Sequence, residues 1–132
     1  MNIVACIDDN KGQLFNGRRQ SKDIQVINKI LKIAEGKNLL INSFSEKLFE
    51  EKAIVKADFL ECATEEEFCF VENVSVSEYI HKINKVYLFK WNRKYPSNFA
   101  FDLDLENNFH LGSVEEFQGN SHELINLEVW EK

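Results

Sequence analysis

Two acids in this chain, Asp23 and Glu72, stand where predicted elements begin or end. Asp23 lies at the start of a helical pattern, and Glu72 directly follows the apolar run 68–71. Two carboxyl groups in one cleft can act as general acid and general base, one donating a proton and the other accepting it. The structural alternative is that Asp23 is a first-turn helix acid and Glu72 a capping carboxylate. The residue types alone leave both interpretations open.

Further polar residues follow the predicted strands or lie in the long segment 8–20. Ligands of mainly parallel sheets bind beyond the carboxyl ends of the strands, so these residues predict a polar cleft. The two neighbouring arginines could clamp an anion bidentately or pair with the acids at positions 8 and 9. As ligand-binding residues we select Asp8, Asn16, Arg18, Arg19, Asn42, Ser43 and Asn73, with Asp9, Asn92 and Arg93 as further neighbours of the cleft.

A second cluster combines cations with aromatic residues. Lys90, Arg93 and Lys94 are interleaved with Trp91 and Tyr95, a composition typical of surfaces that bind single-stranded nucleic acid. Alternation within a strand explains Trp91 more simply as a core residue and Lys90 as solvent-facing. The net charge of −6 also disfavours broad nucleic-acid binding, which requires a basic surface.

The sequence predicts no metal site and no disulfide. The three histidines form no H-x-H or H-E-x-x-H motif, and the three cysteines form no C-x-x-C pair. An odd number of cysteines, two of them inside apolar segments, fits reduced thiols in the cytoplasm. The chain begins without a signal peptide and has no apolar run of the roughly 18 to 20 residues that a membrane span needs. We therefore expect a soluble cytoplasmic protein that does not associate with membranes.

The length and composition predict a single domain over residues 1–132. With 132 residues and 44% hydrophobic positions, the chain can bury one core but is too short for two ordinary domains. Strands are expected at 2–7, 38–43, 53–55, 68–71, 86–91 and 124–130, and helices at 21–36, 45–50, from 58 onward and at 75–84. Strands that alternate with helices indicate right-handed crossovers and a mainly parallel central sheet with helices on both faces, an α/β fold of three layers.

The segments between these elements carry turn residues. Residues 8–20 are expected to form a long polar loop, and residues 107–108 and 120–122 to form turns. After residue 91 the pattern changes, and the short apolar runs around the last turn predict a closing antiparallel hairpin. Ser21 is expected to cap the first long helix, while capping boxes are expected at residues 58–61 and 75–78.

This order of elements, with several local strings, resembles dihydrofolate reductase over nearly the whole chain. The opening strand, Asp8, Gly12, Asn16 and the helix begun at Asp23 are similar to that family's first strand, mobile loop and substrate-binding acid. The string 36–45 resembles its second strand. The string 70–73 stands where the family has a strand that ends in Gly-Gly, and residues 120–122 fall near its last turn. The resemblance implies the same α/β fold and a reductase that uses NADPH.

The departures from the family pattern concern that cofactor. Ser43 replaces the arginine that holds a cofactor phosphate, and Arg18-Arg19-Gln20 replaces Leu-Pro-Trp before the helix. Glu72 follows Ser43 by only 29 positions, where the family fits another strand and helix for the adenosine half. Glu72-Asn73 also replaces Gly-Gly, so that a carboxylate would fill the anion position at a helix N-terminus and repel a phosphate. We therefore expect no cofactor, NADPH included.

Three functions follow, in order of preference. The first is a divergent dihydrofolate reductase-like protein that has lost NADPH-dependent reductase activity and binds a small polar ligand or a protein partner in the cleft. The second is an active reductase, or another enzyme of this cleft, that uses Asp23 with Glu72 as acid and base. The third is an RNA-associated module or nuclease centred on residues 90–95. The sequence leaves open whether the protein is a monomer or a homodimer.

Overall fold

Strand β1 (Asn2–Ile7) is the centre of the molecule. The computed structural model describes residues 1–132 and contains a seven-stranded sheet in the order β5-β4-β6-β1-β7-β10-β9. Strand β1 pairs in parallel with β6 on one side and with β7 on the other, as expected for a central strand. The other strands of this sheet are β4 (Leu39–Ile41), β5 (Ile54–Val55), β6 (Phe68–Phe70), β7 (Lys85–Lys90), β9 (His110–Phe117) and β10 (Ile125–Glu131).

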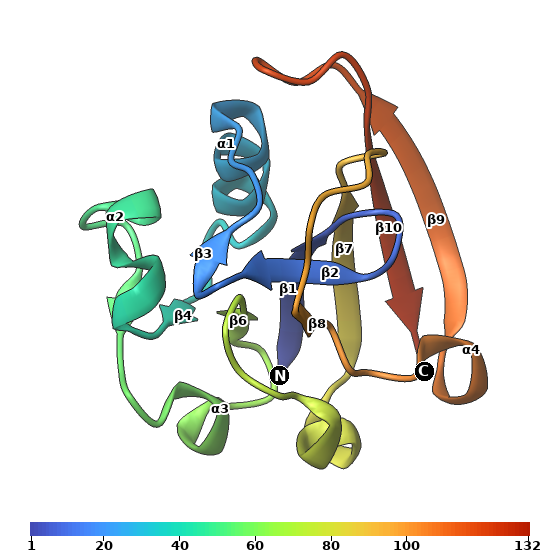
Figure 1. Ribbon diagram of the computed structural model, residues 1–132. Helices are drawn as coiled ribbons and strands as arrows, with labels where there is room; N and C mark the ends of the chain where they lie inside the picture. Colours follow the sequence, from blue (N-terminus) through green and yellow to red (C-terminus); the bar gives the residue numbers. More distant parts are fainter.

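Both faces of the sheet are covered, which explains why β1 lacks an alternating pattern. Ile3, Ala5 and Ile7 belong to one hydrophobic cluster, whereas Val4 belongs to the cluster on the opposite face. Helices α1 (Ile24–Ile33) and α2 (Glu46–Phe49) cover the face of Val4. The short helices α3 (Phe59–Cys62), η2 (Ser77–Lys82) and α4 (Leu105–Asn108) and the segment 99–109 lie on the other face (Figure 1). The predicted three-layer α/β fold is therefore confirmed.

The predicted C-terminal hairpin is also present. Strand β10 pairs antiparallel with β7 and with β9, and the connection between β9 and β10 contains residues 120–122. Strand β9 pairs with β10 along its length, from His110 to Phe117. Residues 107–108, expected as a turn, form the end of helix α4. None of the helices has the length and apolar character that crossing a bilayer requires.

The segment 8–20 is not the predicted loop but contains a β-hairpin. Strands β2 (Gly12–Phe15) and β3 (Arg18–Arg19) pair antiparallel, and β8 (Phe99–Ala100) completes a small second sheet. Asn16 and Gly17 connect β2 to β3 with φ values of 51° and 75°. Positive φ at both positions defines the two-residue turn that Asn-Gly favours, because its twist matches that of the paired strands. The hairpin directs Arg19 toward the end of β6.

Three predicted helix starts differ in the structure. Helix α1 is capped by Asp23 rather than Ser21, since the Asp23 carboxylate accepts a hydrogen bond from the Gln25 N–H at 2.9 Å. Neither predicted capping box forms: α3 has no side-chain cap, and Ser75 bonds to Asp102 of a distant segment. Residues 77–82 accordingly form a 3₁₀ helix that begins after Val76, in place of the α-helix expected at 75–84.

Candidate functional site

Asp23 joins the start of α1 to the loop between β9 and β10. Its Oδ1 accepts hydrogen bonds from the N–H groups of Gln25 and Asn120, both at 2.9 Å. Its Oδ2 accepts from the N–H of Ser121 at 2.8 Å and lies 3.0 Å from Nδ1 of His122. The side chain is almost completely buried, with a residue exposure of 4%. Asp23 therefore anchors two segments that are nearly one hundred positions apart in sequence.

The hydrogen bonds keep Asp23 ionised. Burial alone would raise the pKa of this carboxyl, because a low-dielectric surrounding disfavours the charged form. The donors from Asn120, His122, Ser121 and Gln25 outweigh burial, so the pKa of Asp23 lies well below its ordinary value. At neutral pH the group is a fixed negative charge whose oxygens are already occupied.

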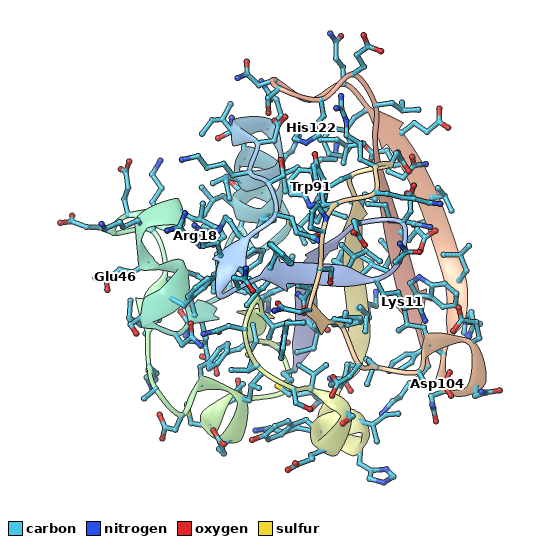
Figure 2. All side chains as sticks on the ribbon, viewed as in Figure 1. Lys11, Arg18, Glu46, Trp91, Asp104 and His122 are labelled. Atoms are coloured by element: carbon cyan, nitrogen blue, oxygen red, sulfur yellow. The ribbon has the colours of Figure 1, made fainter.

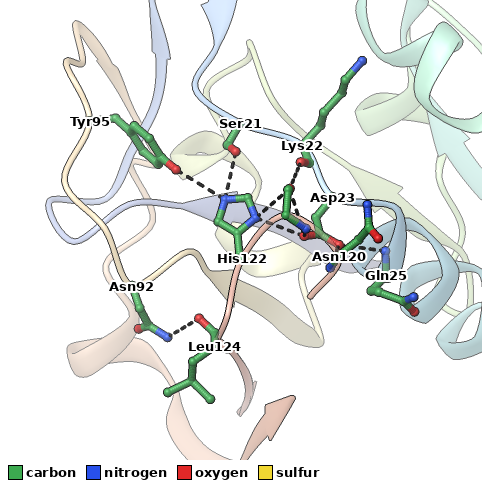
Figure 3. Close-up of polar contacts among 10 residues, drawn as sticks. Ser21, Lys22, Asp23, Gln25, Asn92, Tyr95, Asn120, His122 and Leu124 are labelled. Carbon is green, nitrogen blue, oxygen red and sulfur yellow. Dashed lines mark hydrogen bonds and ion pairs between the residues drawn. The ribbon is translucent and has the colours of Figure 1, made fainter. Parts of the chain in front are cut away.

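His122 was not selected from the sequence, yet it lies at the centre of this network. Its ring stacks on Trp91 with 4.6 Å between centroids, and Figure 2 shows the two side chains beside one another. Its Nε2 lies 3.0 Å from Ser21 Oγ and 3.3 Å from the Tyr95 hydroxyl, and both groups point at the ring (Figure 3). His122 lies in no sequence motif. The one signal for it in the sequence was its position in the predicted turn 120–122.

Glu72 forms an internal ion pair with Arg19. Arg19 Nε donates to Glu72 Oε2 at 2.8 Å, and Nη2 donates to Oε1 at 2.7 Å. The Ser45 hydroxyl also donates to Oε1 at 2.7 Å. Glu72 is only 8% exposed, and its hydrogen bonds raise the pKa of Arg19 above the ordinary value. The counterion of Glu72 is thus an arginine of the β2–β3 hairpin.

This geometry corrects the expected position of Glu72. The sequence placed its carboxylate at the N-terminus of the following helix, but η2 begins only at Ser77. Arg19 also donates to the carbonyl of Phe44 at 3.3 Å and lies over the Phe44 ring, 5.1 Å from its centroid. The neighbouring Arg18 is exposed and takes part in no ion pair of the structure.

The structure brings Asp23 and Glu72 to the same small cavity. Its volume is about 20 Å³, which is room for about one water molecule. The cavity lies at the carboxyl ends of β1 and β6, as expected for a mainly parallel sheet. Besides the two acids it is lined by Cys6, Ser21, Lys22, Val26, Ile27, Leu48, Phe70 and Trp91.

An open groove of about 460 Å³ adjoins this cavity and shares four of its lining residues: Lys22, Asp23, Ile27 and Leu48. The groove runs between the start of α1 and helix α2, and the loop before β10 closes one end. Apolar atoms come from Ile24, Ile27 and Leu48, and Ile24 is 52% exposed. Ile24 is the first residue of α1 and lies on the groove, whereas Val26, Ile27 and Ile30 are the buried residues of this helix. The remaining lining residues are Lys47, Glu50, Asn120 and Ser121.

Both carboxylate oxygens of Asp8 accept hydrogen bonds from other groups of the protein. Its carboxylate accepts from the N–H groups of Gly12 at 2.7 Å, Asn10 at 2.9 Å and Tyr95 at 3.1 Å, and from the Gln20 amide at 3.0 Å. Burial would raise the pKa of Asp8, and these bonds lower it below the ordinary value. Asp8 therefore holds the start of the hairpin and offers no oxygen to a ligand.

The other selected residues lie around the rim. Asn16 is an exposed turn residue that exchanges hydrogen bonds with Asn98. Asn42 caps the 3₁₀ helix η1 (Ser43–Ser45) and donates to Asn73 at 2.9 Å. Ser43 opens onto a second groove, whose charged lining residues are Glu46, Lys47, Glu50 and Glu51.

The cationic cluster does not form an aromatic platform. Trp91 is buried against His122, and Lys90 pairs with Glu128 at 3.5 Å. Arg93 and Asp9 are exposed and joined through their backbones, while the Asn92 amide donates to Asn126 and to the Leu124 carbonyl. No three His, Cys, Asp or Glu side chains converge as a metal site requires.

Of the comparisons with known proteins, the one with solved structures supports the fold. No family model and no curated protein matches the chain. Among solved structures, the chain is similar to dihydrofolate reductase from Enterococcus faecalis, solved in complex with NADP(H) and RAB-propyl. The TM-score is 0.69 at 10% identity, over 99% of this chain and 95% of that chain. The chain therefore has a dihydrofolate reductase-like fold, as its sequence resemblance implied.

Proposed function

We propose that this protein is a dihydrofolate reductase-like protein without NADPH-dependent reductase activity, and that it binds a small amphipathic anion in the groove between α1 and α2. The absence of reductase activity is inferred from the internal pairing of Glu72 with Arg19. The binding of an anion is inferred from the two lysines of the groove.

The residues present do not fit a nicotinamide dinucleotide. An arginine that could hold a phosphate is already neutralised by Glu72, and Ser45 donates to the same carboxylate. The groove beyond Ser43 carries three glutamates and one lysine, a net negative lining that repels phosphates. The cavity between Asp23 and Glu72 has room for water but not for a pterin and a nicotinamide. No hydride step is therefore assigned to this site.

The groove beside α1 lacks the net negative lining of the second groove, because it has two lysines and two acids, Asp23 and Glu50. Lys22 and Lys47 line it, and neither takes part in an ion pair of the structure. Of the two acids, Glu50 has free oxygens, whereas Asp23 is negatively charged but its oxygens already accept hydrogen bonds from the protein. Ile24, Ile27 and Leu48 offer an apolar floor. A flat apolar body with one carboxylate or phosphate complements this surface, since pockets combine apolar area with a few charged groups that fix orientation.

The acid–base alternative has less support. A general acid or base must exchange a proton with a substrate within hydrogen-bond reach. Both oxygens of Asp23 accept several bonds, and both oxygens of Glu72 are paired with Arg19. The RNA alternative needs exposed aromatic rings, and Trp91 is buried.

A thermal-shift comparison of matched probes tests the proposal. We use 2-naphthoate as the anion and 2-naphthamide as its neutral counterpart. At a concentration about tenfold above its Kd, a ligand adds about 1.4 kcal/mol of stability, which raises the Tm of a domain of this size by roughly 3 to 6 °C. We expect this rise with naphthoate and not with naphthamide.

Charge variants place the effect in the groove. The double variant Lys22→Gln with Lys47→Gln should lose the naphthoate shift, whereas Lys52→Gln, an exposed lysine outside the groove, should keep it. Equal shifts with both probes, or a shift that survives the double variant, would overturn the groove as an anion site.

A further inference from the structure

Ser21, His122 and Asp23 form a hydrogen-bonded series. His122 Nδ1 lies 3.0 Å from Asp23 Oδ2, and His122 Nε2 lies 3.0 Å from Ser21 Oγ. We propose that this series is a Ser-His-Asp nucleophilic site that hydrolyses small carboxylic esters. The inference goes beyond ligand binding in the groove and depends on none of the lysine side chains there.

The local chain conformation explains the series. Asp23 has extended backbone angles, with φ −152° and ψ 128°, and Ser21 stands two positions before it. In an extended segment, side chains two positions apart point to the same side. The imidazole of His122 enters from the β9–β10 loop and bridges the serine and the acid (Figure 3).

The surroundings of His122 set the direction of proton transfer. A carboxylate facing Nδ1 holds the proton on that nitrogen, which leaves Nε2 as the acceptor for a hydroxyl. Stacking on Trp91 and burial fix the ring in this orientation. Tyr95 supplies a second hydroxyl at Nε2, but at 3.3 Å rather than the 3.0 Å of Ser21.

Ser21 is less buried than its two partners, and a backbone donor follows it in the sequence. Ser21 is half-buried, in contrast to the buried His122 and Asp23. None of the backbone hydrogen bonds of the structure has the N–H of Lys22 as its donor. In hydrolases with a nucleophilic serine, the N–H of the following residue helps to stabilise the oxyanion. The free Lys22 N–H stands at that position.

The reaction balances with water as the second reactant. Ser21 Oγ attacks the carbonyl carbon while its proton passes to His122 Nε2. The tetrahedral intermediate collapses, the bond to the alcohol oxygen breaks, and the alcohol leaves with the proton from His122. Water then attacks the acyl-serine and gives a proton to His122, which returns it to Ser21 Oγ as the carboxylic acid is released.

The test combines covalent labelling with hydrolysis. An alkyl fluorophosphonate should form a bond from phosphorus to Ser21 Oγ with loss of fluoride, located by peptide mass spectrometry. The protein should also hydrolyse 4-nitrophenyl acetate faster than buffer. Ser21→Ala should abolish the label, and His122→Gln should slow labelling by about 100-fold, the lower range for loss of a general base. Ser113→Ala, an exposed serine of β9, is the matched control and should label at the normal rate.

The outcomes separate a nucleophilic site from a structural network. Circular dichroism verifies that each variant is folded. Of the substitutions in the series, Ser21→Ala should disturb folding least, because it removes only a half-buried hydroxyl. A folded wild-type protein that carries no label at Ser21 would overturn the inference. So would equal labelling rates in wild type and folded His122→Gln. Neither result bears on the naphthoate test, which reports on Lys22 and Lys47.

Discussion

Arg19 and Glu72, which are 53 positions apart, form a two-point ion pair in which Nε and Nη2 each donate to a separate carboxylate oxygen, at 2.8 and 2.7 Å. The pair joins the β2–β3 hairpin to the end of β6, beside the central strand. A bidentate geometry of this kind fixes both side chains. The β2–β3 hairpin is therefore held at the carboxyl ends of the strands by the ion pair between its Arg19 and Glu72.

Arg19→Met should destabilise the protein by about 2 to 3 kcal/mol. The change leaves the buried Glu72 carboxylate without its cation, and an unpaired buried charge is strongly unfavourable. The effect stays below that of a fully buried pair because a quarter of the Arg19 side chain is exposed. Urea unfolding measures the difference. The neighbouring Arg18→Met removes an exposed arginine without an ion pair and should change stability by less than about 0.5 kcal/mol. Equal losses from both variants would contradict a specific role for the pair.

Asp23 should make the protein sensitive to acid. Its pKa in the folded state is depressed below the ordinary value of 3.8, so its contribution to stability is fully present above about pH 4. That contribution is lost as the pH falls through the folded-state pKa, because the carboxyl must then take up a proton. The free energy of unfolding, followed by urea titration from pH 7 to about pH 3, should decline at the acid end.

Replacing Asp23 isolates its share of this decline. Asp23→Asn should lower stability at pH 7 by about 2 kcal/mol and flatten the slope at low pH, because an amide cannot titrate and loses acceptor capacity. Asp9→Asn alters an exposed acid and should retain the wild-type slope. Asp8, whose pKa is also depressed, maintains part of the slope in both variants. Identical acid slopes for wild type and Asp23→Asn would show that Asp23 does not carry the effect.

Gly119 permits the close approach of the β9–β10 loop to Asp23. A Cβ at this position would lie 2.6 Å from Asp23 Oδ2 and 2.9 Å from the carbonyl of His122. Gly119→Ala should therefore destabilise the protein by about 2 kcal/mol through overpacking. Gly112→Ala meets only the flexible end of Glu131, so its effect should be smaller. Thermal unfolding ranks the two variants, and the reverse order would contradict the packing of this loop.

Much of the fold was predictable because local patterns and tertiary structure agree. The apolar run at the start of the chain has no alternation, and β1 is covered on both faces. The Asn16-Gly17 pair carried a hairpin signal, which the polar composition of the segment 8–20 concealed. The capping box predicted at residues 75–78 does not form, and the reason is different. Ser75 and the Val76 N–H bond to Asp102, a tertiary partner that local spacing does not reveal.

The sequence predicted that some of the candidate residues lie near one another, but not which of them pair. Asp23 and Glu72 were selected as acids of one cleft, and they line the same cavity. The two arginines were expected either to clamp an anion or to pair with Asp8 and Asp9. Arg19 pairs with Glu72 instead, because the hairpin reverses the chain before Arg19. His122 lies in no sequence motif. Its contact with Asp23 forms only because the β9–β10 loop folds back onto α1. Such contacts join distant segments, and a single sequence contains no signal for them.

Direct titration with NADPH tests the central claim that this protein does not bind the cofactor, because Arg19 is already paired with Glu72. Isothermal titration calorimetry, with the Enterococcus faecalis enzyme as positive control, measures binding. We expect no saturable binding of NADPH to this protein at concentrations up to about 1 mM, a limit of roughly 4 kcal/mol of binding free energy. Stoichiometric binding with a micromolar Kd would contradict the account.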